Sequence, residues 1–304
     1  MMRAALCFAA LFTAGLASVH AESQPAEQTF ATAQEAAQAL VNAAAQNDTA
    51  ALLKIFGPSG RDIVESGDAA EDKAGRARFA DLAHAKMQVL PEPGNPDRAT
   101  LEVGPQDWPF PVQLVHKNNQ WYFDSAAGRV EVLARRVGRN ELTAIDVCRG
   151  YVEAQMEYAA HDRNGDGVLQ YAQRIVSSPG KKDGLYWEGE ADNLVPKGFA
   201  GAAAALFAEG KKPLPYHGYY FHTLKAQGPD APGGALDYVV KGKMIGGFAL
   251  IAYPAEYGVS GIKTFLVSHH GVVYEKDLGN ATATLARQIT RFNPDKTWKA
   301  IEGE

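Results

Sequence analysis

The sequence predicts an α+β protein of two halves, in each of which helices lead into an antiparallel sheet. Two observations favour this fold class. Apolar residues recur at intervals of three or four in two separate stretches, and each stretch is followed by short strand-like segments separated by Gly, Pro and Asn turns. Helices that precede a run of strands, rather than alternating with them, are typical of α+β folds. We therefore expect an N-terminal domain over residues 30–140 and a C-terminal domain over residues 141–304.

The first 21 residues have the features of a secretory signal peptide. MMR is a short basic start, residues 4–16 form an uncharged apolar run, and SVHA supplies small side chains at the positions that a signal peptidase reads. A transmembrane helix needs about 20 apolar residues, which is more than this run contains. We expect cleavage after Ala21, a flexible segment over residues 22–29, and a periplasmic or secreted mature protein without a transmembrane anchor.

The composition argues against several classes of function. The chain has 30 Lys and Arg residues against 35 Asp and Glu residues, without a long run of one sign, so nothing indicates binding to nucleic acid or to an anionic membrane. Loss of Cys7 with the signal peptide leaves Cys148 as the one thiol, which rules out an intramolecular disulfide in the mature chain. Cys148 falls on the apolar stripe of a helix, where a small buried hydrophobic role is expected.

The N-terminal half begins with helix signals and continues with strands. Thr32, followed three residues later by Glu35, forms a capping box, and Asp48 or Asn47 can cap a second, shorter helix. The pattern then changes to the strand-like segments MQVL, ATLEV, FPVQLVHK and WYFDS. Residues 118–119, Asn-Asn between two apolar runs, are expected to form a hairpin tip.

The C-terminal half repeats this order of elements. Apolar residues at helical spacing predict an amphipathic helix over residues 143–160, followed by the turn DRNGDG and a short helical stretch. An Ala-rich helix is expected over residues 199–207. Strands then dominate in GYYFHTLKA, LDYVVKG, MIGGFALIAYP, TFLVS and VVYEKD, and Asn280 can cap a last helix.

Residues 162–173 align with a calcium loop of the EF-hand type. Such a loop takes oxygen ligands from positions 1, 3, 5, 7, 9 and 12 and needs Gly at position 6, because alternating oxygens then converge on one hard cation. Gly167 occupies the sixth position. The candidate ligands in order are Asp162, Asn164, Asp166, the backbone carbonyl of Val168, Gln170 and Gln173. The pattern predicts a structural Ca²⁺ site.

The twelfth position departs from this pattern, because it holds Gln173 where the loop needs a bidentate Glu. Either the affinity is low, or a carboxylate from elsewhere completes the shell, for which Asp183, Glu188 and Glu157 are the candidates. A weak site is compatible with an extracellular module, where dissociation constants of roughly 10⁻⁴ to 10⁻³ M occur. The alternative is that Asn-Gly-Asp-Gly is an ordinary turn after a helix.

The sequence contains no evident catalytic set. It has no G-x-S-x-G, no H-E-x-x-H and no phosphate-binding glycine loop. His217 and His222 are five residues apart, a spacing that places two side chains on opposite faces of a strand. We therefore expect a non-catalytic binding or accessory role, with an envelope hydrolase built around His217, His222 or Asp183 as the alternative.

Several long segments resemble the bacterial exported family catalogued as domain of unknown function 2950. They are DRNGDGVLQYAQRI, SSPGKKDGLYW, PYHGYYF and YGVSGIKTFLVSHHGVVYEKDLG, with WYFDSAAGR and RRVGRNE in the N-terminal half. The resemblance implies a Gram-negative envelope location, and it carries no established activity, substrate or site residues.

Two further likenesses concern the fold of each half. YGVSGIKTFLVSHHGVVY is similar to the closing strands of type II pseudopilins and related pilin-like proteins, although the chain lacks the uncleaved apolar helix that assembles a filament. The N-terminal half resembles the cone-shaped domains of the nuclear-transport-factor-2-like group. A fold likeness assigns no function. The expected partner is an unknown envelope protein or cell-wall component, and an accessory subunit of a pilus-like or secretion assembly is a further alternative.

Overall fold

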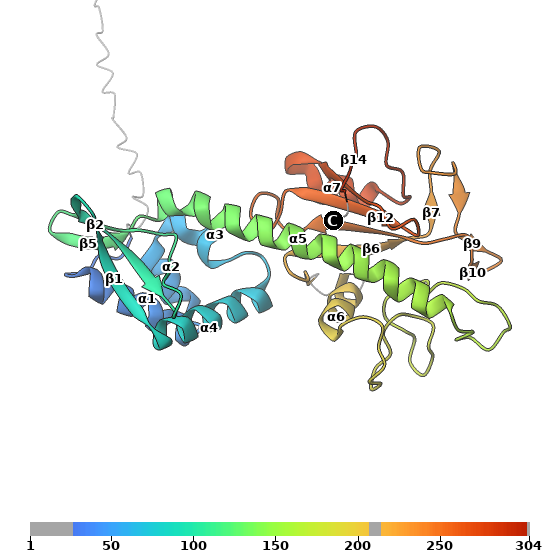
Figure 1. The fold of residues 1–304 in the computed structure, drawn as a ribbon, viewed down its shortest axis with the longest axis horizontal. Helices are drawn as coiled ribbons and strands as arrows, with labels where there is room; N and C mark the ends of the chain where they lie inside the picture. The colour runs from blue at the N-terminus through green and yellow to red at the C-terminus, as the bar shows by residue number, and fades with distance from the viewer. Residues whose placement is uncertain (1–26, 207–213, 303–304) are drawn as a thin grey trace, which may run out of the picture.

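The protein consists of two α+β halves joined by one long helix (Figure 1). The computed structural model describes residues 27–206 and 214–302. The expected signal peptide and most of the expected flexible segment lie outside the described residues. Each half has its own cluster of buried apolar side chains, one drawn from residues 36–123 and the other from residues 144–292.

The N-terminal half packs helices against one antiparallel sheet. Its helices are α1 (Ala33–Ala45), α2 (Thr49–Phe56), the short η1 (Pro58–Gly60) and α3 (Arg61–Val64), and α4 (Ala69–Ala85). Its strands are β1 (Met87–Glu92), β2 (Asn95–Val103), β3 (Trp108–Pro109), β4 (Leu114–Lys117) and β5 (Gln120–Phe123). They are arranged in the order β1-β2-β4-β5, with β3 also paired to β2.

Local signals in this half act as expected from the sequence. The Thr32 hydroxyl accepts a hydrogen bond from the Glu35 backbone N–H at 3.1 Å, and the Asp48 carboxylate caps α2 through the Ala51 N–H at 2.9 Å. Both residues of the Asn118–Asn119 tip have positive φ, which is the conformation that a two-residue type I′ hairpin needs.

The C-terminal half is built around a five-stranded antiparallel sheet of order β14-β13-β12-β11-β6. These strands are β6 (Tyr219–Leu224), β11 (Ala249–Pro254), β12 (Lys263–Ser268), β13 (Val273–Asp277) and β14 (Lys299–Ala300). The smaller elements are α6 (Lys197–Leu206), β7 (Ala226–Gln227), β8 (Leu236–Asp237), β9 (Val239–Val240), β10 (Lys243–Met244), η2 (Gly279–Ala281) and α7 (Thr282–Gln288). Every residue of β11 is buried, because this strand is paired on both edges, with β12 and β6, and has helices packed on it.

Helix α5 (Ser125–Ala159) crosses from one half to the other (Figure 1). It starts 18 residues before the helix expected at 143–160, because Asp124 caps it through the Ala127 N–H at 3.1 Å. Val132 packs against the first core, and Cys148 is fully buried in the second. Residue 140, the expected end of the first domain, therefore lies inside a continuous helix.

Two local expectations in the C-terminal half are wrong. Residues 168–176 are not helical, because Tyr171 pairs with the backbone of Met244 and Val176 with that of Tyr186 instead of bonding within a helical turn. Asn280 does not cap α7, which begins without a side-chain cap after η2.

Burial of Cys148 agrees with the expected hydrophobic role and raises the pKa of its thiol to about 12. Among the helices of residues 27–206 and 214–302, none is long and apolar enough to cross a bilayer.

The close approach of α5 to the first sheet depends on Gly128. A β-carbon at this position would lie 2.8 Å from Val112 Cα, which is closer than packed carbons come. We predict that Gly128→Ala lowers the free energy of unfolding by about 1–3 kcal/mol. Gly138→Ala on the same helix is the control, because its β-carbon meets nothing within 4 Å and should stabilise by about 0.4–1 kcal/mol. Urea denaturation measures both changes, and equal effects would contradict the packing.

Candidate functional site

A pocket of about 410 Å³ opens in the N-terminal half, where it meets the C-terminal half. Helices α1 to α5 all contribute to its walls, and Gly218 of the other half lies at its edge. We call it the junction pocket. Its volume lies in the range of about 300–1,000 Å³ that is usual for small-molecule sites.

The floor of the junction pocket is apolar and aromatic. Phe110 lies at the centre of an aromatic group, with ring centroids 5.3 Å from Phe79, 6.2 Å from Phe56 and 6.4 Å from Trp108. The lining also includes Leu40, Leu52 and Val132. Such surface binds apolar groups because burial removes their hydrocarbon surface from water.

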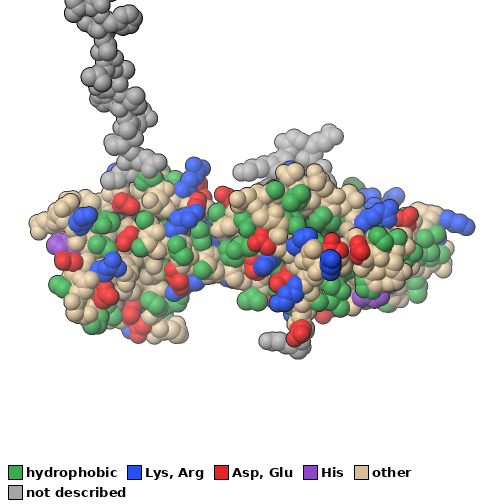
Figure 2. All heavy atoms as spheres, turned by 90° about the horizontal axis from the view of Figure 1, so that it is seen from above, with side chains coloured by type: hydrophobic (Ala, Val, Ile, Leu, Met, Phe, Trp, Pro, Cys, Tyr) green, Lys and Arg blue, Asp and Glu red, His purple; other side chains and the backbone are tan. Residues whose placement is uncertain are grey.

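The rim of the junction pocket is charged. Five arginines line it, namely Arg76, Arg78, Arg135, Arg136 and Arg139, together with three carboxylates, Asp68, Glu71 and Asp72. This leaves two positive charges in excess, whereas the whole chain carries a formal net charge of -5. On the face of the molecule in Figure 2, by comparison, acidic and basic side chains are interspersed over both halves.

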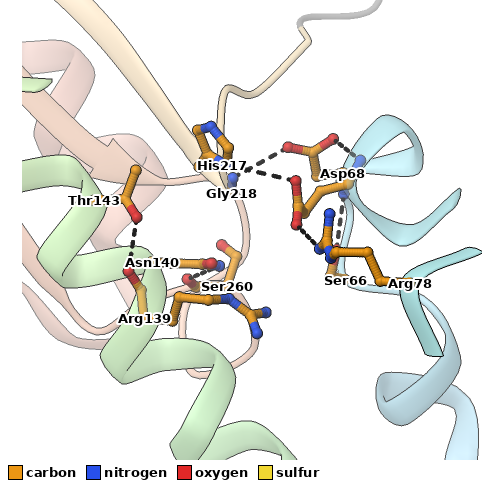
Figure 3. A network of polar contacts seen from close by, with 10 residues as sticks. Ser66, Asp68, Arg78, Arg139, Asn140, Thr143, His217, Gly218 and Ser260 are labelled. Atoms are coloured by element: carbon orange, nitrogen blue, oxygen red, sulfur yellow. Dashed lines mark hydrogen bonds and ion pairs between the residues drawn. The ribbon is translucent and has the colours of Figure 1, made fainter. Parts of the chain in front are cut away.

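Two carboxylates of the rim, Asp68 and Glu71, contact the C-terminal half (Figure 3). Asp68 caps α4 through the Glu71 N–H and also accepts a hydrogen bond from the Gly218 N–H at 3.2 Å. Glu71 forms an ion pair with Arg78 at 2.6 Å, and its carboxylate lies 3.5 Å from His217 Nδ1. On the other side of the junction, Asn140 donates to the Ser260 carbonyl at 2.9 Å. The pocket edge is thus fixed by contacts from both halves.

The expected calcium ligands form a compact exposed turn. Asp162 accepts hydrogen bonds from the N–H groups of Gly165, Asp166 and Gly167, of which the last, at 2.7 Å, does most to lower the pKa of Asp162. Asp166 lies 2.9 Å from the Lys243 ammonium group. Asn164 is exposed and Gln170 is buried. The helix expected to follow the loop from Val168 onward does not form.

The twelfth position of the loop is engaged elsewhere, since the Gln173 amide donates to the Gly242 carbonyl at 2.6 Å. Of the three carboxylates considered for the shell, Asp183 accepts from Ser178 N and Oγ at 2.7 and 2.9 Å, and Glu157 and Glu188 are exposed. Within residues 27–206 and 214–302, no three or more His, Cys, Asp or Glu side chains are grouped to hold a metal ion. The loop offers two carboxylates and neutral oxygens, and calcium there stays a prediction.

The residues considered for a hydrolase lie in different surroundings. His217 precedes β6 in a turn with positive φ and pairs with Glu71. His222 lies within β6 opposite Ile251, where burial lowers its pKa. Asp183 is held by Ser178 in the long connection after α5. The junction pocket is therefore the strongest candidate site, and its lining includes none of these three residues.

Sequence reasoning did not identify the arginines of the pocket. RRVGRNE, which contains three of them, was noted only as a motif shared with a family. A signal was present, because Val132, Arg136 and Arg139 are spaced by four and three and so share one helix face. This spacing becomes informative only once α5 is known to begin at residue 125.

The fold and pocket define an α+β protein with a small-molecule-sized pocket at the junction of its halves. The chain belongs to the family described as "Protein of unknown function (DUF2950)", whose model matches residues 27–301. No curated protein and no solved structure matches the chain, so neither the pilin-like nor the nuclear-transport-factor-2-like likeness gains support.

The calcium hypothesis leads to a prediction with an internal control. Millimolar CaCl₂ should raise the melting temperature of the mature protein by several degrees, because a cation that binds the folded form alone stabilises it. Asp162→Ala should abolish this shift. Lys243→Gln should instead enlarge it, since Ca²⁺ must compete with the Lys243 ammonium for Asp166. Differential scanning calorimetry with CaCl₂ or a chelator measures the shift, and identical curves for the parent protein would leave residues 162–167 as an ordinary turn.

Proposed function

We propose that this protein is a non-catalytic binding protein of the bacterial envelope that takes a small, largely apolar molecule in the junction pocket. The observation that carries the proposal is the pocket itself, about 410 Å³ in volume, with an aromatic floor and a charged rim. Binding sites for small molecules usually combine apolar walls with a few polar groups that fix orientation.

The expected export and calcium binding fit the same proposal. A signal peptide at residues 1–21 would place the protein in the periplasm or outside the cell, where the family resemblance also points. Ca²⁺ at residues 162–173 would stabilise the turn after α5. This turn belongs to the C-terminal half, which meets the edge of the pocket at Gly218. The unknown envelope protein or cell-wall component expected from the sequence would then act as donor or acceptor of the bound molecule.

The alternatives have less to support them. A hydrolase needs its nucleophile, base and orienting group within hydrogen-bond reach. His217 contacts Glu71 and Asp183 contacts Ser178, whereas His222 lies within β6. An accessory role in a pilus-like or secretion assembly needs a large exposed apolar surface. The exposed apolar side chains among the described residues are spread over many elements.

Obstruction of the pocket tests the proposal. Gly75 lies on α4 in the pocket wall, and a β-carbon there would meet nothing closer than Arg78 Nη2 at 3.8 Å. Gly75→Leu should therefore fill the pocket without straining the helix, and it should weaken ligand binding by about tenfold or more. Decanoate and decan-1-ol are the probes, each titrated by isothermal calorimetry. Trp108 fluorescence, with Trp108→Phe as the blank, reports on binding at the pocket mouth.

Gly150→Leu is the matched control for this experiment. It makes the same substitution in a helix, at a site with nothing within 4 Å and outside the pocket lining. We expect one molecule of at least one probe to bind the parent protein and the Gly150→Leu variant equally. No binding of either probe to the parent protein, or undiminished binding to Gly75→Leu, would refute the proposed function.

A further inference from the structure

The arginines of the junction pocket differ in how far their charge is already neutralised. Arg78 pairs with Glu71, and Arg135 pairs with Glu131 at 2.6 Å. Arg76 donates instead to neutral oxygens of Asn47, Thr49 and Val64, at 2.8–2.9 Å. These three guanidinium groups are thus occupied by contacts within the protein.

Arg136 and Arg139, like Arg76, have no carboxylate partner that would neutralise their charge. Arg136 is half-buried and donates to the backbone carbonyls of Asp62 and Ile63 at 2.5 and 2.8 Å. Within the described part of the chain, neither arginine forms an ion pair with a carboxylate, and the Arg139 guanidinium has no hydrogen-bond partner. The two side chains are one helical turn apart on α5, so their positive charges lie side by side.

The surroundings of Arg136 make its charged form less stable, as its lowered pKa indicates. Burial does most to lower the pKa of Arg136. The charge of Asp72 raises this pKa by more than the charge of Arg139 lowers it, and Asp62 and Glu256 raise it by less, so the net direction is downward. The acidic groups of the rim are themselves engaged. Asp72 accepts from the Ser66 N–H at 3.0 Å, and Asp68 and Glu71 hold the junction. An anion beside the two arginines would add the ion pair that the protein does not supply.

The geometry points to a single-chain amphiphile with an anionic head group, which lies along α5 with its head at Arg136 and Arg139 and its apolar chain over the aromatic floor. This inference rests on the proposed function and specifies its ligand class. Val132 and Arg139 both line the pocket, and seven residues of helix separate them by about 10 Å, which suits a chain of about ten carbons. A guanidinium group matches a carboxylate or a phosphate through paired hydrogen bonds.

The test compares head groups on one chain length. Decanoate, decyl phosphate, decan-1-ol and decyltrimethylammonium are titrated into the mature protein by isothermal calorimetry. Both anions should bind at least about tenfold more tightly than the alcohol, which corresponds to one charge-assisted hydrogen bond or more. Whichever anion binds more tightly identifies the head group, and either order supports the proposal. Equal affinity for alcohol and anions, or tighter binding of the ammonium compound, would overturn it.

Arg139→Gln assigns the effect to the pocket. This side chain is exposed and has no partner among the described residues, so its loss should leave the fold intact. The variant should weaken decanoate by about tenfold and leave decan-1-ol unchanged. Arg149→Gln, on the exposed face of the same helix and outside the pocket, removes an equal charge and should change neither affinity. If decan-1-ol binds in the pocket and Arg139→Gln leaves decanoate binding unchanged, the head-group assignment fails while the proposed function stands.

Discussion

The continuity of helix α5 is the constraint on which the rest of the structure depends. One rigid helix packs against the first core through Gly128 and Val132 and against the second through Cys148, so neither half can turn without displacing the other. The Asn140 hydrogen bond to Ser260 holds the helix to the second half near its midpoint. The same stretch of helix carries Arg136 and the neighbouring arginine at the pocket rim. The helix that joins the halves therefore also positions charged side chains of the junction pocket.

The parts of the fold that could be predicted from sequence are those fixed by local chemistry. Thr32 and Asp48 cap their helices because a side-chain oxygen reaches an N–H group three residues away, and the hairpin at 118–119 depends on its own two residues. The start of α5 was missed because Gly138 and several β-branched residues weaken helix propensity, which packing on both sides overrides. The helix expected after residue 167 does not form, because there tertiary contacts override a local helical pattern. Its backbone groups are taken by distant segments, which no local pattern reveals.

The distinction between local and long-range contacts also applies to the calcium loop and the junction pocket. The loop at 162–167 was visible in the sequence because all its candidate ligands are close neighbours, and the structure adds the Lys243 ion pair, which comes from a segment about 80 residues away. The junction pocket draws on α1, α2, α3, α4 and α5 at once, so its residues share no motif. The count of charged residues gives a mildly acidic chain, and it does not reveal the excess of positive charge at the junction pocket. Only the fold shows that Arg136 and Arg139 lack carboxylate partners and face apolar surface.

The central claim is that the junction pocket holds an anionic amphiphile, and a crystal structure grown with decanoate tests it most directly. We expect density for the alkyl chain against Phe79 and Phe110, with the carboxylate within hydrogen-bond distance of the Arg139 guanidinium. Decanoate found elsewhere on the protein, with only water in the junction pocket, would contradict the claim.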